Sequence, residues 1–160
     1  MQNVGRQLRE TLSVVAGLPR RRADDRALEL LAAARLADPE AVRRRYPHQL
    51  SGGQRQRVMI AMALANEPDI LIADEPTTAV DVTIQAQLLK LLADLQQRLG
   101  MALLFITHDL NIVRKIAPRV AVMQKGEIVE IGPTARVLKT PSHPYTQRLI
   151  AAEPTDLDDF

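Results

Sequence analysis

The sequence contains neither cysteine nor tryptophan, and only two tyrosines and two phenylalanines. Without cysteine the chain can form no disulfide and no thiolate metal site, which fits a reducing compartment. So few aromatic side chains also argue against stacking on single-stranded nucleic acid as the main function. The core must therefore be built from leucine, isoleucine, valine, alanine and methionine.

Long apolar runs are also missing. No stretch approaches the roughly 18 apolar residues that a membrane-spanning helix needs, and the first ten residues hold no apolar signal core. We therefore expect a soluble cytoplasmic chain that reaches a membrane only by docking on other subunits. Its 160 residues are enough for one domain with a buried core.

Charge is distributed unevenly along the chain. Residues 1–60 hold 12 arginines and 6 acids, a balance of +6, whereas residues 61–160 hold 9 basic and 13 acidic residues, a balance of −4. The runs Arg20–Arg22 and Arg43–Arg45 are compatible with a nucleic-acid patch. Solvated helix ends explain them equally simply, and we favour that interpretation.

Residues 6–66 are predicted to be helical, with breaks at Pro19 and Pro39. The last of these helices spans Gly53–Asn66, and Ser51 is a suitable N-cap for it. Apolar residues at helical spacing form the expected core, namely Leu8, Leu12, Val15, Ala27, Leu28, Leu30, Leu31, Ala34, Val58, Met59, Ala61, Met62 and Leu64.

Residues 69–123 change to a strand–helix pattern. Two continuous apolar runs, Ile70–Ala73 and Ala102–Ile106, are typical of parallel strands buried on both faces. A helix over Val82–Leu99, stopped by Gly100, separates them. A helix at Asp109–Ala117 and a strand at Arg119–Met123 follow, so we predict an α/β fold with a parallel sheet.

The remaining residues form a smaller C-terminal part. Lys125-Gly126 predicts a tight turn and a hairpin with a second strand at Glu127–Ile131. A short helix over Pro133–Leu138 and a proline-rich segment over 140–145 come next. The acidic end, Asp156–Phe160, is expected to be disordered. The predicted organisation is thus a helical part (1–66), an α/β core (67–123) and a C-terminal hairpin with a tail (124–160).

The loop Leu50–Gln54, with the sequence LSGGQ, has the chemistry of an anion site. Gly52 and Gly53 let the backbone approach a ligand closely, and the following helix begins with free amides and the positive end of its dipole. Ser51 adds a hydroxyl and Gln54 an amide. An ordinary serine cap after a glycine turn accounts for the same residues.

Two acids, Asp74 and Glu75, stand at the end of the first apolar run, where ligands bind in open α/β sheets. Adjacent strand residues point to opposite faces, so the two acids can take different roles. One can hold Mg²⁺ directly or through water, and the other can act as a general base toward an attacking water. Solvated acids at a strand end are the plainer alternative.

Two further polar residues follow the strands. Asp81 precedes the helix at Val82 and is suited to cap it. His108 follows the second apolar run, at the same expected sheet edge as the acids, and an imidazole there can donate a hydrogen bond to phosphate. A purely structural histidine is the alternative. His48 and His143 carry no catalytic assignment.

These segments together resemble the ATP-binding cassette (ABC) ATPases. LSGGQ followed by Arg55–Arg57 resembles the family's signature motif, and Ile70–Pro76 resembles its Walker B motif with the catalytic glutamate. Thr78–Asp81 resembles the D-loop, and Ile106–Leu110 resembles the switch-histidine region. The resemblance covers nearly the whole chain but only about the last three-fifths of a typical cassette.

The resemblance implies a fold and a site. The fold is the C-terminal part of a P-loop NTPase (RecA-like) core with parallel strands, plus the ABC helical subdomain. ATP and Mg²⁺ are the implied cofactors. Roles carried over by motif are Mg²⁺ binding for Asp74, water activation for Glu75, γ-phosphate contact for His108, and nucleotide contact across a dimer for Ser51, Gly52, Gly53, Gln54 and Asp81.

The C-terminal tail narrows the branch. Gly126–Glu130 and the segment His143–Thr146 resemble importers of oligopeptides, dipeptides and nickel, and Met101–Leu110 suits the first cassette of a fused double-cassette peptide or glutathione importer. The implied partners are a second cassette, transmembrane permease subunits and, indirectly, a periplasmic or extracellular substrate-binding protein, with no nucleic acid. The implied location is the cytoplasmic face of the inner or plasma membrane.

The sequence has no phosphate-binding loop of the form Gly-x-x-x-x-Gly-Lys-Ser/Thr, because none of its four lysines follows a glycine. We therefore expect poor ATP binding and a marginal fold for this chain alone. Three functions stay open: an importer ATPase acting with other subunits, a soluble ABC ATPase for DNA repair or translation, and an inactive half-site that only interacts.

Overall fold

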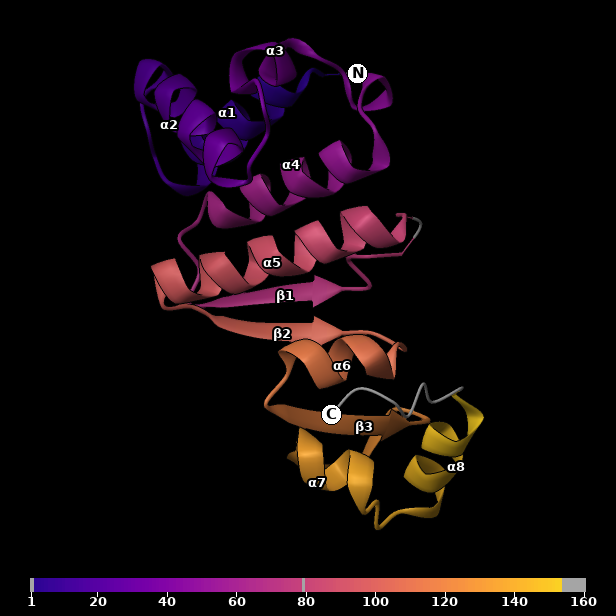
Figure 1. The fold of residues 1–160 in the computed structure, drawn as a ribbon. Helices are drawn as coiled ribbons and strands as arrows, with labels where there is room; N and C mark the ends of the chain where they lie inside the picture. The colour runs from indigo at the N-terminus through magenta and orange to yellow at the C-terminus, as the bar shows by residue number, and fades with distance from the viewer. Residues whose placement is uncertain (1, 79, 154–160) are drawn as a thin grey trace. The chain divides into compact units, whose positions relative to one another are not determined.

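The computed structural model describes residues 2–78 and 80–153, and the chain divides into two compact units, Met1–Leu104 and Phe105–Phe160. The first unit holds α1 (Val4–Val15), α2 (Arg20–Ala33), α3 (Pro39–Arg44), the 3-10 turn η1 (Pro47–Gln49), α4 (Gly52–Leu64), β1 (Ile70–Asp74), α5 (Val82–Leu99) and the start of β2 (Ala102–Ile106). The second holds the end of β2, then α6 (Leu110–Ile116), β3 (Arg119–Gln124), β4 (Glu127–Pro133), α7 (Thr134–Lys139) and α8 (Pro144–Ala152). The predicted mixture of helices and strands is confirmed (Figure 1).

The helices α1 to α4 form the apolar core of the first unit's N-terminal part. Helix α1 packs against α2 and α3, and α2 also packs against α4. Most of the predicted core residues are buried, but Val15 is 56% exposed. Val15 shares the face of α1 that buries Val4, Leu8 and Leu12, but it is the last residue of the helix, so its exposure reflects its position at the helix end.

Helix α4 also differs in part from the prediction. Val58, Ala61 and Leu64 are buried as expected, whereas Met59 is exposed and Ile60 is buried in its place. These four buried residues lie on one side of α4, and Met59 lies on the opposite side. The predicted placement of Met59 in the core is therefore wrong.

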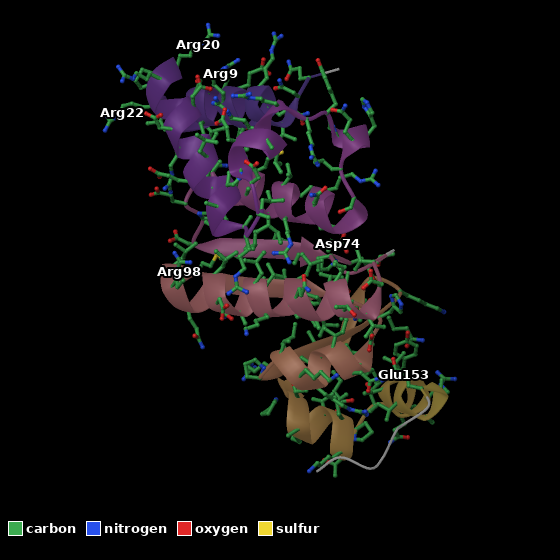
Figure 2. The ribbon with its side chains drawn as sticks, turned by 45° about the horizontal axis from the view of Figure 1, so that its top comes forward. Arg9, Arg20, Arg22, Asp74, Arg98 and Glu153 are labelled. Atoms are coloured by element: carbon green, nitrogen blue, oxygen red, sulfur yellow. The ribbon has the colours of Figure 1, made fainter. Side chains whose placement is uncertain are left out.

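The strands β1 and β2 pair in a two-stranded sheet, and α5 lies beside β1 (Figures 1 and 2). Burial alternates along β1: Leu71 and Ala73 are buried, whereas Ile70 and Ile72 are 60% and 62% exposed. In β2, Leu104 and Ile106 are likewise exposed. The prediction of strands buried on both faces is wrong for the described residues, which cover only one face of the sheet.

The strand β3 does not continue that sheet within the described residues. It pairs antiparallel with β4, in a separate two-stranded sheet. The turn between them is tight, since Lys125 and Gly126 both have left-handed backbones, with φ of 51° and 84°. Two consecutive left-handed residues match the twist of a hairpin, so the predicted turn is confirmed. The prediction that Arg119–Met123 simply extends the first sheet is not borne out.

The C-terminal helices follow the hairpin. Helix α7 confirms the short helix predicted over Pro133–Leu138, but the sequence reasoning missed α8. Pro144 occupies the first turn of α8, and the Nδ1 atom of His143 caps it by accepting a hydrogen bond from the Tyr145 amide at 3.1 Å. A proline at a helix start is favourable, so a cap followed by Pro144 was the available signal. The predicted disorder of Asp156–Phe160 falls outside the described residues.

The tail is held to the hairpin by one buried carboxylate. Glu130 in β4 is 8% exposed and accepts hydrogen bonds from the backbone amides of Ser142 at 2.9 Å and His143 at 3.1 Å. These bonds, that of Ser142 foremost, lower the pKa of Glu130 to about 2. Each amide favours the charged carboxylate, so the contact depends on ionised Glu130.

Glu130 should make the stability of the second unit depend on acid pH. Its folded pKa lies below the unfolded value of 4.5, so its stabilising contribution is complete above pH 4.5 and is lost as pH falls toward 2. Glu130→Gln should lower stability at neutral pH and flatten the pH dependence of urea unfolding in this window. Glu127→Gln, on the same strand but exposed, is the control and should leave the pH profile unchanged; equal profiles for both variants would contradict the assignment.

Candidate nucleotide-site half

The loop Leu50–Gln54 starts helix α4 through a reciprocal cap. The Ser51 hydroxyl accepts a hydrogen bond from the Gln54 amide at 3.2 Å, and the Gln54 side-chain oxygen accepts one from the Ser51 amide at 3.1 Å. Ser51 is exposed, and Gly52, Gly53 and Gln54 are half-buried. The predicted N-cap is confirmed, and the start of α4 remains open to solvent, as an anion-binding helix end requires.

Close packing against a neighbouring helix also requires glycine at position 53. A Cβ added there would lie 2.8 Å from the Cγ2 atom of Ile84, in the first turns of α5. The start of α4 and the start of α5 therefore approach closely at this point, which the sequence reasoning did not foresee. This packing sets the position of the loop Leu50–Gln54, here called the signature loop, relative to Asp81, which caps α5.

Gly53→Ala should destabilise the first unit by about 1–3 kcal/mol, because the added methyl group overpacks against Ile84. Ile84→Ala should relieve most of this clash, so the double variant should lose less stability than the two single variants together. Urea unfolding of the four proteins measures the coupling. Strictly additive losses would show that Ile84 does not restrict position 53.

Arg57 links α4 to its surroundings. Its guanidinium donates to the Ala34 carbonyl at 3.2 Å and to the Gln87 side-chain oxygen in α5 at 3.0 Å. Burial, followed by the nearby charge of Arg35, lowers the Arg57 pKa. Arg57 thus connects the end of α2 with α4 and α5, and it helps to hold the signature loop in place.

The two acids lie where β1 ends. Asp74 is the last residue of the strand and is exposed (Figure 2), and Glu75 is half-buried. Glu75 has a left-handed backbone, with φ of 47°. A non-glycine residue in this region is uncommon and is often found at functional sites. Glu75 therefore lies beyond the strand, in a turn, and the prediction that strand alternation separates the two acids does not apply to it.

Thr78 orients Glu75, and the sequence reasoning missed this contact. The Thr78 hydroxyl donates to Glu75 Oε2 at 2.9 Å, and the Thr78 amide donates to the Glu75 carbonyl at 3.1 Å. Asp81, three residues on, accepts a hydrogen bond from the Ile84 amide at 2.9 Å and caps α5. The predicted cap role of Asp81 is thus confirmed, while its role at a nucleotide stays a prediction.

His108 is exposed and lies just before α6, which Asp109 caps by accepting bonds from the amides of Asn111 and Ile112. Glu153 of α8's end also accepts a bond from the Leu110 amide at 3.1 Å. His108 belongs to the second unit and the acids to the first. Its expected position beside Asp74 and Glu75 therefore stays a prediction.

Few side chains that could bind a metal ion lie close together in the described residues. Within residues 2–78 and 80–153, no group of three or more His, Asp or Glu side chains is arranged to hold a metal ion. Mg²⁺ is commonly held by only one or two protein carboxylates, with water and phosphate oxygens completing its shell. A single exposed carboxylate such as Asp74 fits that requirement when a phosphate is present.

Similarity to known proteins agrees with these features. Residues 1–78 match the family described as ABC transporter. The chain is 56% identical over 154 residues to the peptidoglycan transport ATP-binding protein YejF of Agrobacterium fabrum, covering 96% of this chain and 28% of that protein. It is 51% identical to the probable peptide ABC transporter ATP-binding protein y4tR of Sinorhizobium fredii, covering 96% of this chain and 46% of that one. The glutathione import ATP-binding protein GsiA of Salmonella paratyphi A is 52% identical, with 94% and 24% covered.

Solved structures give the same class. The ATP-binding cassette MJ0796, in a dimeric post-hydrolysis state with ADP and Pi, superposes with a TM-score of 0.71 at 33% identity, covering 84% of this chain and 57% of that one. The fold and the signature loop therefore define an ATP-binding cassette. Residues 1–78 thus match the ABC transporter family, and the chain resembles the ATP-binding proteins of peptide and glutathione importers. It spans less than half the length of the curated relatives described above.

Proposed function

We propose that this chain contributes the signature-loop half of a composite ATP site in an ABC importer of peptides or related small solutes. The observation that carries the proposal is the capped start of α4, where Ser51 is exposed and Gly52 and Gly53 are only half-buried. A helix start of this kind binds phosphate through its amides and its dipole. The dimeric state of the cassette MJ0796 supports a site shared between two cassettes.

The remaining site residues take the roles that their chemistry allows. Asp74 offers a carboxylate to Mg²⁺, which when bound neutralises phosphate charge. Glu75, oriented by Thr78, accepts a proton from the attacking water, and His108 donates a hydrogen bond to the γ-phosphate. Asp81 and Gln54 act at the neighbouring nucleotide. These residues form a catalytic set only together with a phosphate-binding loop, so the chain alone should hydrolyse ATP poorly.

The names of the relatives support an inference about the partners and the location of this protein. Peptide, peptidoglycan and glutathione transport support a role beside transmembrane permease subunits at the cytoplasmic face of the membrane, with a substrate-binding protein as an indirect partner. No helix in the described part of the chain has the length and apolarity of a membrane span, so contact with the permease would occur through protein surfaces. The boundaries 1–66, 67–123 and 124–160 are proposed as its functional divisions.

A mixing experiment tests the proposal. The chain is combined with a cassette that has an intact phosphate-binding loop but a disabled signature loop, and phosphate release is measured. Restored hydrolysis, with little hydrolysis by either protein alone, is the expected result. A mixture no more active than its parts would refute the shared site, and efficient hydrolysis by the chain alone would show that it needs no partner.

A further inference from the structure

The corner between α1 and α2 combines exposed apolar and exposed basic side chains. Val14 and Val15 are 83% and 56% exposed at the end of α1. After Gly17 and Pro19, the exposed arginines Arg20, Arg21 and Arg22 begin α2. Figure 2 shows Arg20 and Arg22 projecting away from the helices. We call residues 13–22 the α1–α2 corner.

In the part of the chain that the structure describes, acidic side chains do not balance the positive charges of the arginines in this corner. Among the described residues, no ion pair involves Arg20, Arg21 or Arg22, whereas Arg9 pairs with Asp24 at 3.1 Å and Arg6 pairs with Glu10 at 3.2 Å. The three arginines also fill the first turn of α2, at the positive end of its dipole, where cations are unfavourable. Pro19 supplies no side-chain cap there. This helix start therefore lacks a compensating negative charge.

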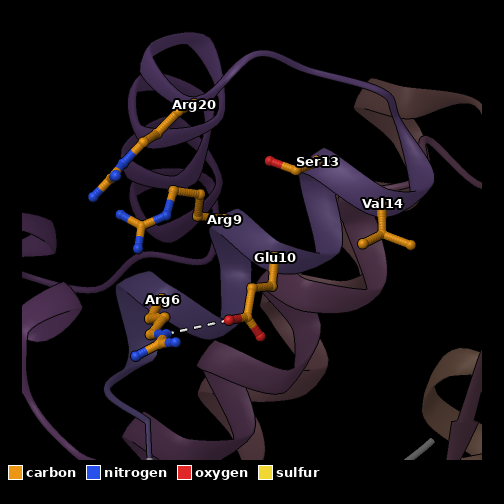
Figure 3. A pocket seen from close by; sticks show the side chains of 6 residues that line it. All are labelled: Arg6, Arg9, Glu10, Ser13, Val14 and Arg20. Atoms are coloured by element: carbon orange, nitrogen blue, oxygen red, sulfur yellow. Dashed lines mark hydrogen bonds and ion pairs between the residues drawn. The ribbon is translucent and has the colours of Figure 1, made fainter.

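An open hollow of about 510 Å³ adjoins the corner. It is lined by Arg6, Arg9, Glu10, Ser13, Val14 and Arg20. Figure 3 shows the guanidinium groups of Arg9 and Arg20 extending in the same direction, with Ser13 and Val14 farther along α1. In this hollow the guanidinium of Arg20 offers N–H donors to a phosphate group, since guanidinium recognises phosphate through paired hydrogen bonds, whereas Arg6 and Arg9 already pair with Glu10 and Asp24.

We propose that the α1–α2 corner binds the surface of an anionic membrane, with lipid phosphates on the arginines and the two valines in the headgroup–acyl boundary. Interfacial segments combine basic and apolar side chains in this way, and each arginine near an anionic bilayer strengthens binding severalfold. A nucleic acid would satisfy the arginines but would leave the valines in water. The inference goes beyond the proposed function and does not require it.

Vesicle sedimentation of the complete chain tests this assignment. Vesicles of phosphatidylcholine with and without phosphatidylglycerol are compared at low and high salt. Replacing Arg20, Arg21 and Arg22 together by glutamine should weaken binding to the acidic vesicles by about a hundredfold. The same triple replacement at Arg43–Arg45 removes equal charge elsewhere and should weaken binding by only a few-fold.

A second variant tests the apolar part. Val14→Ser combined with Val15→Ser keeps every charge and should weaken vesicle binding by about tenfold. Because both valines are exposed, circular dichroism should show unchanged helix content in this double variant. Binding that needs no phosphatidylglycerol, equal losses for the two arginine triples, or insensitivity to the valines would overturn the proposal. The proposal would also be overturned if an acidic polypeptide, added as a competitor, displaced the chain from the vesicles.

Discussion

Ser51→Asp should abolish the ability of this chain to restore ATP hydrolysis in a signature-disabled partner cassette, by at least about a hundredfold. Aspartate is as good an N-cap as serine, so the start of α4 should stay folded. Its negative charge, however, would meet the γ-phosphate that the exposed Ser51 is proposed to contact. Phosphate release in the mixture measures the loss, and circular dichroism confirms that the helix is retained.

Matched variants separate this effect from general electrostatics. Ser13→Asp introduces the same charge at another exposed serine and should leave the restored hydrolysis intact. Ser51→Thr keeps a hydroxyl and the cap, and should retain most of the activity. If Ser51→Asp behaved like Ser13→Asp, the start of α4 would not be facing the partner's nucleotide, and the proposed half-site would be wrong.

Leu91→Ala should lower the free energy of unfolding of the first unit by about 2–5 kcal/mol. Leu91 lies in the middle of α5 and is 1% exposed, with Leu88, Leu92 and Leu95 buried beside it. Truncation leaves a cavity that neighbouring side chains can fill only in part. Since one face of the β1–β2 sheet is exposed, we expect the free energy of unfolding of this unit to be small. The loss should therefore appear as a much lower urea concentration at the midpoint of unfolding.

The same substitution at the end of the same helix is the control. Leu99 is 55% exposed, so Leu99→Ala changes little buried area and should shift unfolding by no more than about 0.5 kcal/mol. Comparable losses for Leu91→Ala and Leu99→Ala would mean that α5 does not bury its leucine face as described. A loss confined to Leu91 would confirm α5 as the helix that stabilises this unit.

Local signals made the secondary structure largely predictable. Asp81 and Gly100 mark the ends of α5, because a side-chain cap and a left-handed C-terminal residue are properties of a few neighbouring residues. Lys125-Gly126 likewise predicts its own turn. The motifs of the candidate site are also continuous in sequence, so the family resemblance could be recognised without coordinates. Helix α8 was missed because its start lies in the segment 140–145, which was interpreted only as proline-rich.

The sequence by itself therefore determined the order of the helices and strands up to α7, the caps at Ser51 and Asp81, and the identity of the motifs. Only the tertiary structure decided which apolar residues are buried, since burial depends on what covers a face. Ile70 and Ile72 have the composition of a buried strand yet lie exposed. The contacts of Gly53 with Ile84 and of Glu130 with Ser142 join residues 31 and 12 positions apart in the printed sequence. No local pattern specifies such pairs, because they form only when separate elements pack together.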